Sequence, residues 1–256
     1  MKFLVREVRE TGSTNADVLA AAQAGEPEGL VVSAGTQTAG RGRLGRTWQS
    51  PPGGGLWFSV LLRPADVPPA RLGWLPLLAG VALAHTVREV AGVPTELKWP
   101  NDLLVGGKKC AGILAEATGT GAIALGIGLN TRLTEEQLPP PPPSGLPPTS
   151  LTLSGGSTVD NNALLHGLLD RLDDAYAVWR AAGGDAEACG LRSAYQQICA
   201  TIGLDVRAIL PGGAEVRGRA TTVDSEGRLV VAGQAVAAGD IVHLRADTQA
   251  MPRTGR

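Results

Sequence analysis

Strand-like stretches of alternating or continuous apolar residues recur through the first half of the chain. They lie at residues 3–8, 30–34, 56–63, 95–99, 103–105, 109–117 and 122–129. The stretch 56–63 is apolar almost throughout, so we expect a strand covered on both faces. Glycine-containing turns at 106–107 and 119–121 are good hairpin connections, which favours antiparallel pairing of the strands they join.

Apolar residues at helical spacing predict helices at 71–91, 160–181 and 187–200. A further helix is predicted from Thr14 to Ala24, because Thr14 and Asp17 resemble a capping box and Gly25 is a typical stop. The fold class is therefore α+β, with a mixed, mainly antiparallel sheet packed with helices.

After residue 204 the hydrophobic pattern changes to short strand-like stretches of alternating residues, separated by turns at 211–213 and 225–227. This pattern predicts a small C-terminal β-barrel. We expect an α+β domain at 1–202, the β-barrel domain at 203–248 and a flexible tail at 249–256. The proline-rich run 139–148 is predicted to be an extended surface connection without chemistry, or alternatively a proline-motif ligand.

Composition narrows the function classes. The 256 residues are 43% apolar with a net charge of −1, which provides for a core and argues against a general nucleic-acid or membrane-surface binder. We see no uncharged apolar window that would span a membrane. Three cysteines and three histidines make neither a disulfide framework nor a spaced metal quartet, so we expect a cytoplasmic protein without a metal site of its own.

The 37 residues between Glu28 and Asp66 contain no carboxylate but include four arginines. Within them, the segment 40–48 (GRGRLGRTW) combines glycines, which allow close backbone approach, with guanidinium groups that bind carboxylate or phosphate. Trp48 adds a flat face for a purine or a guanidinium. This predicts an anion site, although a Gly/Arg loop on its own is also compatible with a solvated surface turn; it is not a P-loop.

Two further segments carry polar residues at strand ends. Residues 98–102 (KWPND) are followed by Lys108 and Lys109, and a lysine beside this turn can point into the same cavity as the arginine loop. The segment 126–131 (GIGLNT) ends a strand with two glycines and an amide. Taken singly, the first is typical of an ordinary turn and the second of a strand packed closely against another backbone.

Together the motifs resemble those of the biotin–protein ligases. The resemblance rests on five segments in order: 13–15 (STN), 37–48 (QTAGRGRLGRTW), 98–102 (KWPND), 109–114 (KCAGIL) and 126–130 (GIGLN). It implies the biotin/lipoate ligase-like catalytic fold and an SH3-like barrel at the C-terminus.

The resemblance also implies site residues. Biotin would be bound by Ser13, Thr14, Asn15, Gln37, Arg41, Gly42, Arg43, Lys109 and Gly112. ATP would be bound by Arg43, Arg46, Trp48, Asn101, Asp102, Lys109 and Asn130. The catalytic residues would be Lys109, Arg41 and Arg43.

The implied reaction has two steps. Biotin and ATP, with Mg²⁺ carried on the phosphates, would form biotinyl-5′-AMP, and biotin would then pass to a lysine of a biotin carboxyl carrier protein. We expect residues 37–54 to be mobile without ligand and to close over the adenylate.

Phe3 opens the predicted catalytic domain almost at once, so we expect no winged-helix DNA-binding region and no repressor function. A homodimer is possible. The nearest alternative enzyme is a lipoate or octanoate ligase or transferase, whose pocket would accept a straight chain. A β-barrel binding module for protein or RNA would rest on residues 204–245 alone.

Overall fold

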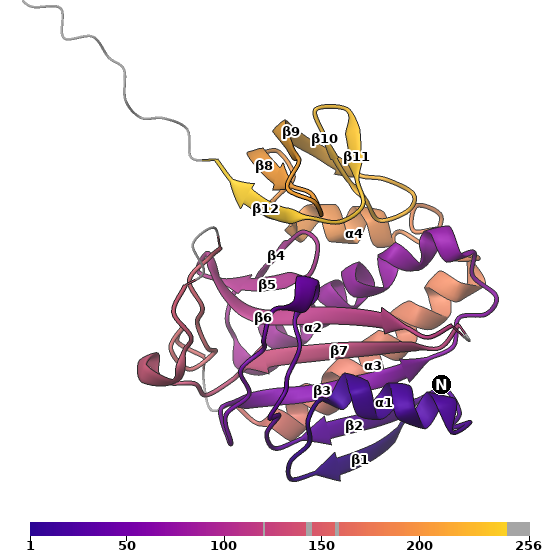
Figure 1. Cartoon of the computed structure of the whole chain (residues 1–256), viewed down its shortest axis with the longest axis vertical. Coiled ribbons are helices and arrows are strands. Elements are labelled where there is room, and N and C mark those ends of the chain that lie inside the picture. Colours follow the sequence, from indigo (N-terminus) through magenta and orange to yellow (C-terminus); the bar gives the residue numbers. More distant parts are fainter. Residues whose placement is uncertain (120, 142–144, 157–158, 245–256) are drawn as a thin grey trace, which may run out of the picture.

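The computed structural model describes residues 1–119, 121–141, 145–156 and 159–244. Its main element is a seven-stranded sheet with the strand order β1-β2-β3-β7-β6-β5-β4 (Figure 1). The strands are β1 (Leu4–Val8), β2 (Leu30–Ala34), β3 (Gly55–Leu62), β4 (Glu96–Lys98), β5 (Asp102–Val105), β6 (Lys108–Ala117) and β7 (Ile123–Asn130). Only β1 and β2 are parallel, and the other neighbours pair antiparallel. The predicted mixed, mainly antiparallel sheet is confirmed.

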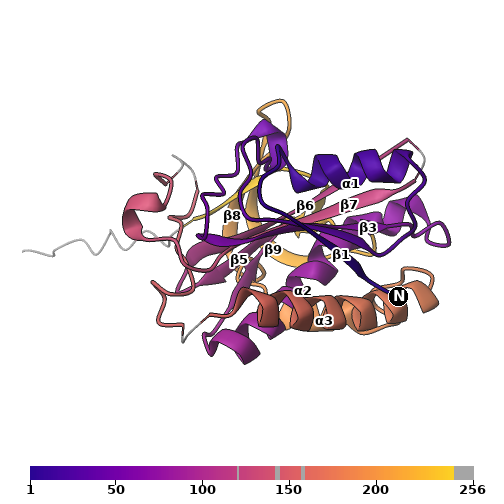
Figure 2. The same ribbon diagram turned by 90° about the horizontal axis from the view of Figure 1, so that it is seen from below.

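Helices cover both faces of this sheet. Helix α1 (Thr14–Gln23) lies on one face, whereas α2 (Leu75–Ala91) and α3 (Asn161–Ala181) lie together on the other (Figure 2). The shorter α4 (Leu191–Ile198) packs against α2. The helix-covered faces match the predicted α+β class.

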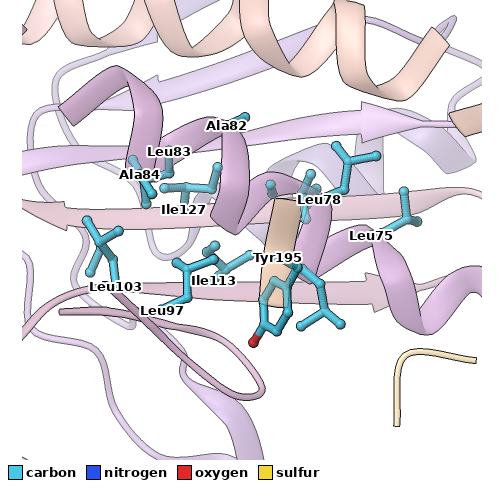
Figure 3. Close-up of a cluster of buried hydrophobic side chains, with 14 of the residues drawn as sticks. Leu75, Leu78, Ala82, Leu83, Ala84, Leu97, Leu103, Ile113, Ile127 and Tyr195 are labelled. Carbon is cyan, nitrogen blue, oxygen red and sulfur yellow. The ribbon is translucent and has the colours of Figure 1, made fainter. Parts of the chain in front are cut away.

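The two faces of the seven-stranded sheet carry different residues: one face packs into the core, and the other carries residues of the predicted site. Leu97, Leu103, Ile113 and Ile127 are buried beneath α2 (Figure 3). Because neighbouring residues of a strand point to opposite faces, the residues beside them on β4 to β7 face the α1 side. That side carries Lys98, Asp102, Gly112, Gly126 and Gly128.

Helix α2 is preceded by a 3-10 turn (Pro69–Trp74), and the combined segment Pro69–Ala91 is long and apolar enough to cross a membrane by length and composition alone. In the folded chain α2 packs against α3 and β6, and most of its residues are buried in the core. This segment therefore has the character of a core helix.

The start of α1 differs from the predicted capping box. Ser13 is the residue before the helix, and no side chain caps the first turn. The hydroxyl of Thr14 instead lies within hydrogen-bond distance of Gln37 Oε1 (3.2 Å) and Ser59 Oγ (2.7 Å). The helix start is thus fixed by tertiary contacts, because Thr14 is buried where these polar groups meet.

The C-terminal strands form a second sheet with the order β11-β10-β9-β8-β12. They are β8 (Asp205–Ile209), β9 (Glu215–Val223), β10 (Leu229–Val231), β11 (Gln234–Val236) and β12 (Asp240–His243). We call this sheet with its turns the C-terminal module (205–243). Closure into a barrel and the domain limits 1–202 and 203–248 remain predictions. The expected flexible tail at 249–256 lies outside the described residues.

Two tryptophans attach the module to the larger sheet. The indole N–H groups of Trp74 and Trp99 donate to the carbonyls of Ser225 (3.1 Å) and Gly227 (3.0 Å). A Cβ on Gly227 would lie 2.8 Å from the backbone of Gly73, so the two backbones approach too closely for a side chain. The module consequently sits over the β4 end of the sheet (Figure 1).

Candidate active site

All fourteen residues predicted for the site line one cavity of about 370 Å³. They are Ser13, Thr14, Asn15, Gln37, Arg41, Gly42, Arg43, Arg46, Trp48, Asn101, Asp102, Lys109, Gly112 and Asn130. The cavity lies on the α1 side of the sheet, beneath the arginine loop (residues 37–54). Segments as far apart in the sequence as Ser13 and Asn130 are thus brought together as predicted. The ligand assigned to each residue remains a prediction.

A polar cluster forms the α1 end of the cavity. The Thr14 backbone N–H donates to Gln37 Oε1 (2.9 Å), and Gln37 Nε2 donates to Ser50 Oγ (2.9 Å). Ser59 Oγ lies 2.6 Å from Asn15 Oδ1, to which it donates. Each amide is therefore held in one orientation by its neighbours, as a site that recognises a polar ligand requires.

Asn15 also connects this cluster to the arginine loop. Its Nδ2 donates to Glu116 Oε2 at 2.7 Å, and the other oxygen of Glu116 lies 3.4 Å from Arg41 Nη1. Glu116 therefore orients one predicted biotin residue and pairs with another.

Glycines on β6 and β7 make room for these side chains. A Cβ on Gly126 would lie 2.2 Å from Asn15 Oδ1, and a Cβ on Gly128 would lie 2.6 Å from the Trp48 indole. At Gly112 the same test gives 3.0 Å to Trp48. The two glycines of the 126–131 segment are thus explained by close side-chain approach from above the sheet.

Trp48 lies across these strands at the centre of the cavity. Its ring meets Trp57 edge to face, with centroids 6.3 Å apart. Lys109 Nζ lies 5.5 Å from the centroid of the Trp48 ring. The aromatic face is rigidly supported from below and is positioned to stack on a planar group.

Lys109 is held both by its side chain and by its backbone. Its ammonium forms an ion pair with Asp102 at 2.6 Å. Its backbone N–H donates to Pro147 O (2.9 Å), and its carbonyl accepts from Thr149 N–H (2.8 Å). The end of the proline-rich segment is therefore bound alongside β6 at the predicted catalytic lysine.

This contact corrects the prediction that the 139–148 segment is a surface connection without a part in the site. Pro139, Pro140, Leu146 and Pro148 line the cavity. The physical reason is that Asn130, at the end of the central strand β7, donates from Nδ2 to Thr149 O (2.9 Å) and holds the returning chain against the ends of the central strands.

The arginine loop crosses the cavity with a left-handed residue at its tip. Leu44 has φ 56° and is more than half exposed. Next to it, Arg46 Nη2 lies 2.6 Å from Asp240 Oδ1 on β12. The C-terminal module therefore contacts the loop directly and contributes Gly239, Asp240 and Ile241 to the cavity wall.

The segment 29–65 contains no acidic residue of its own, but carboxylates from other elements reach the cations of the cavity. Glu116, Asp102 and Asp240 approach from other elements and pair with Arg41, Lys109 and Arg46. Counting acidic residues within 29–65 could not reveal these carboxylates, because β6, β5 and β12 supply them.

Two cations of the lining, Arg43 and Lys98, have no ion pair among the described residues. Lys98 is only 9% exposed. Burial lowers the pKa of the Lys98 ammonium, and the nearby Asp102 carboxylate opposes this effect. Burial likewise lowers the pKa of the Arg43 guanidinium. The cavity thus has excess positive charge that a bound anion would stabilise.

Asn101 and Asn130 use their amide N–H groups within the protein. Asn101 Nδ2 donates to Ile113 O at 2.9 Å, which fixes the turn between β4 and β5. Both side chains line the cavity, and their predicted contact with ATP remains a prediction. Within the described ranges, no group of three or more His, Cys, Asp or Glu side chains is arranged to hold a metal ion.

The arrangement joins a small polar pocket, an aromatic platform and a cluster of cations in one cavity. Groups of these three kinds can bind a polar ligand, a planar ring and an anion, respectively. The chain belongs to the biotin/lipoate A/B protein ligase family, whose model matches residues 9–130, and the model of the biotin protein ligase C terminal domain matches residues 201–244.

Individual proteins of known name show which members of this ligase family the chain is similar to. A biotin–[acetyl-CoA-carboxylase] ligase of Mycobacterium tuberculosis is 42% identical over 93% of this chain and 88% of its own length. A bifunctional ligase/repressor of Bacillus subtilis is 35% identical over 80% of this chain and 62% of its own length. The structure of the Aquifex aeolicus biotin protein ligase in complex with biotin and ATP is matched with a TM-score of 0.77, at 25% identity, over 94% of this chain and 99% of that one.

Proposed function

We propose that the protein activates biotin with ATP and transfers it to a lysine of a biotin carboxyl carrier protein belonging to a biotin-dependent carboxylase. The observation that carries this proposal is the continuity of the cavity. It runs from the Asn15–Gln37 polar cluster, past Lys109, to Trp48 and the arginine loop.

In the first step the carboxylate oxygen of biotin attacks the α-phosphorus of ATP. The bond from that phosphorus to the bridging oxygen breaks, and pyrophosphate leaves. A carboxylate is ionised at neutral pH and needs no base, but it is repelled by the phosphates. At an effective dielectric constant of ~20, each pair of unit charges ~4 Å apart repels by about 4 kcal/mol.

Lys109 and Arg43 reduce this repulsion, since both are cations of the cavity lining and both are assigned to the biotin and the ATP subsites. The Lys109 amine lies over β6 beside Gly112 and close to Trp48. Cations fixed before the reaction also stabilise the charge that develops on phosphorus. In the second step the amine of the acceptor lysine attacks the carbonyl of biotinyl-5′-AMP, and AMP leaves as an amide bond forms.

The test is biotin-dependent exchange between ATP and pyrophosphate, followed by mass spectrometry of a carrier domain incubated with the protein, biotin and Mg-ATP. We expect both signals from the wild-type protein. Exchange supported by octanoate or lipoate and not by biotin would instead favour the lipoate ligase alternative.

Lys109→Ala should lower the rate of adenylate formation by at least about a hundredfold, since it removes a cation that acts mainly in the transition state. Lys108→Ala is the matched control, because Lys108 is the neighbouring lysine and is exposed to solvent. Equal activity of the Lys109 variant and the control would contradict the role of Lys109.

Three finer points belong to the same proposal. We infer that the protein acts in the cytoplasm, in keeping with its three free thiols, and that it is not a repressor, in keeping with its net charge of −1. A gel-shift assay with biotin and operator-like DNA tests whether the protein is a repressor.

We also infer that the protein can form a homodimer. Sedimentation with and without biotinyl-5′-AMP tests this.

A further inference from the structure

Lys98 is a buried lysine for which the predicted reaction has no assigned use. Its side chain lines the cavity and is 9% exposed. None of the described residues forms an ion pair with its ammonium. A charged amine is retained in such a place only at a substantial desolvation cost, so a ligand that supplies negative charge is the simplest compensation.

The strand register fixes where Lys98 lies. On β7, β6, β5 and β4 the residues Gly128, Gly112, Asp102 and Lys98 are direct neighbours in one row across the sheet. Paired residues of antiparallel strands point to the same face. With strands about 4.8 Å apart, the Lys98 backbone lies roughly 10 Å from that of Gly112, over which Trp48 and Lys109 pack.

The polar cluster predicted for biotin lies in the opposite direction. Asn15 packs over Gly126, which pairs with Ser59 and Leu114 two residues further along the strands. Lys98 is thus on the far side of Lys109 from this cluster. An extended ligand that begins at Asn15 and passes Lys109 reaches Lys98 last.

Two further cations and two carboxylates lie near Lys98. Burial is the main reason that the pKa of its ammonium is lowered; Asp102 and Asp240 raise this pKa, and Lys109 and Arg46 lower it. On the module side, His243 faces Lys98 and lies 3.2 Å from Thr201 Oγ1. Burial lowers the pKa of His243 to about 4, so this histidine is neutral near pH 7 and needs no counter-charge.

We propose that Lys98 binds the terminal phosphates of ATP, the part that leaves as pyrophosphate, together with Arg43 and Arg46. This inference rests on the proposed function for its ligand. Lys98 would hold the leaving group in line with the attacking carboxylate while Lys109 serves the α-phosphate. Arg46 would exchange its ion pair with Asp240 for a phosphate oxygen.

The test compares Lys98→Met with the wild-type protein in two measurements. Calorimetric titration with inorganic pyrophosphate, ATP and AMP gives the affinities of the free protein. We expect Lys98→Met to weaken binding of pyrophosphate and ATP by about ten- to a hundredfold, the effect of losing one charge-assisted contact, and to leave AMP binding within about twofold. In steady-state kinetics the KM for ATP should rise while the KM for biotin stays unchanged.

Two further variants separate charge from packing. Lys98→Arg keeps the charge and should recover most of the pyrophosphate affinity. Lys108→Met removes an exposed lysine nearby and should bind all three ligands as the wild type does. Biotin affinity and the melting temperature of each variant show that the fold is retained.

Unchanged pyrophosphate binding in Lys98→Met, or an equal loss of AMP binding, would overturn the inference. The inference about Lys98 can fail while the wild-type protein still shows biotin-dependent exchange between ATP and pyrophosphate. In that case the proposed function stands. If instead pyrophosphate binding depends on Lys98 but no biotin-dependent exchange occurs, the proposed function fails and the phosphate site remains.

Discussion

Gly126 and Gly128 lie two residues apart on β7 and face two different parts of the cavity. A Cβ at 126 would displace Asn15, and a Cβ at 128 would displace Trp48. Each contact is too short for a real side chain, so the neighbour would have to move. These glycines therefore allow a prediction that separates the two predicted subsites.

We expect Gly126→Ala to raise the KM for biotin by about tenfold or more, because Asn15 is displaced from its hydrogen bonds to Ser59 and Glu116. Gly128→Ala should mainly raise the KM for ATP, because the Trp48 ring is tilted. Steady-state exchange kinetics with each substrate varied in turn measure both effects.

Gly119→Ala is the control for this pair. Gly119 is exposed near the other end of the same hairpin, and a Cβ there would meet no atom of the described residues within 4 Å. Swapped effects, with the 126 variant impaired for ATP and the 128 variant for biotin, would reverse the assignment of the two subsites.

At the residue scale, the sequence correctly predicted that the arginine segment and a lysine beside the 98–102 turn line one cavity. Few other residues combine close backbone approach with fixed positive charge, so an anion is the expected ligand, and this ligand remains a prediction. The carboxylate partners of these cations could not be predicted. Glu116 lies in a strand pattern that gives no sign of its contact with Arg41, and Asp240 lies almost two hundred residues from Arg46.

At the scale of elements, the arginine loop is fixed at several separate points. Gln37 contacts α1, Trp48 packs on β6 and β7, and Arg46 pairs with β12. The Arg46–Asp240 pair is exposed, so its contribution to stability is small, about 0–1 kcal/mol. It joins two elements that both line the cavity, so it can restrain the loop before ligand binds.

We expect Asp240→Asn to increase amide hydrogen exchange at residues 43–46 of the free protein. Saturating biotin plus ATP should lower exchange across residues 37–54 in both proteins, since the ligand replaces the carboxylate as the partner of Arg46. The KM for ATP should stay equal or fall, because a carboxylate that repels the phosphates is removed.

Exchange in β10 serves as the internal reference, since this strand lines no part of the cavity. If ligand left exchange in residues 37–54 unchanged, the loop would not act as a lid. If Asp240→Asn left exchange at 43–46 of the free protein unchanged, the ion pair would not restrain it.

Elements with a clear period were predicted within a few residues, as the observed β2 (Leu30–Ala34) and α3 (Asn161–Ala181) show. The proline-rich segment was not placed, because proline composition excludes helix and central strand but says nothing of where an extended chain runs. Its position depends on hydrogen bonds from Asn130 and Lys109, which only the tertiary structure brings within reach.

At the scale of the whole molecule, the C-terminal module is part of the active-site wall. The sequence pattern predicted a separate β unit, and its strands are confirmed, but alternation along a strand cannot show which face meets another domain. The contact depends on two tryptophan N–H groups and on the Gly73–Gly227 approach. Through β12, the docked module therefore forms part of the cavity that is proposed to bind the nucleotide.

His243 at the end of β12 makes this docking sensitive to acid. Its imidazole is half-buried beside Thr201, and burial together with the charge of Lys98 lowers its pKa to about 4 from an ordinary value near 6.5. Below about pH 6.5 the unfolded chain takes up a proton at this position that the folded chain does not. Stability is thus fully present above pH 6.5 and falls as the pH drops towards 4.

Between pH 7.5 and pH 5 the wild-type protein should lose about 1–2 kcal/mol more of its free energy of unfolding than His243→Gln, after allowance for partial exposure of the ring to solvent. Urea unfolding at the two pH values measures this difference. His166→Gln, which removes an exposed histidine on α3, should follow the wild type. A loss of stability that is the same in His243→Gln and the wild type would mean that His243 ionises as freely in the docked module as in the unfolded chain.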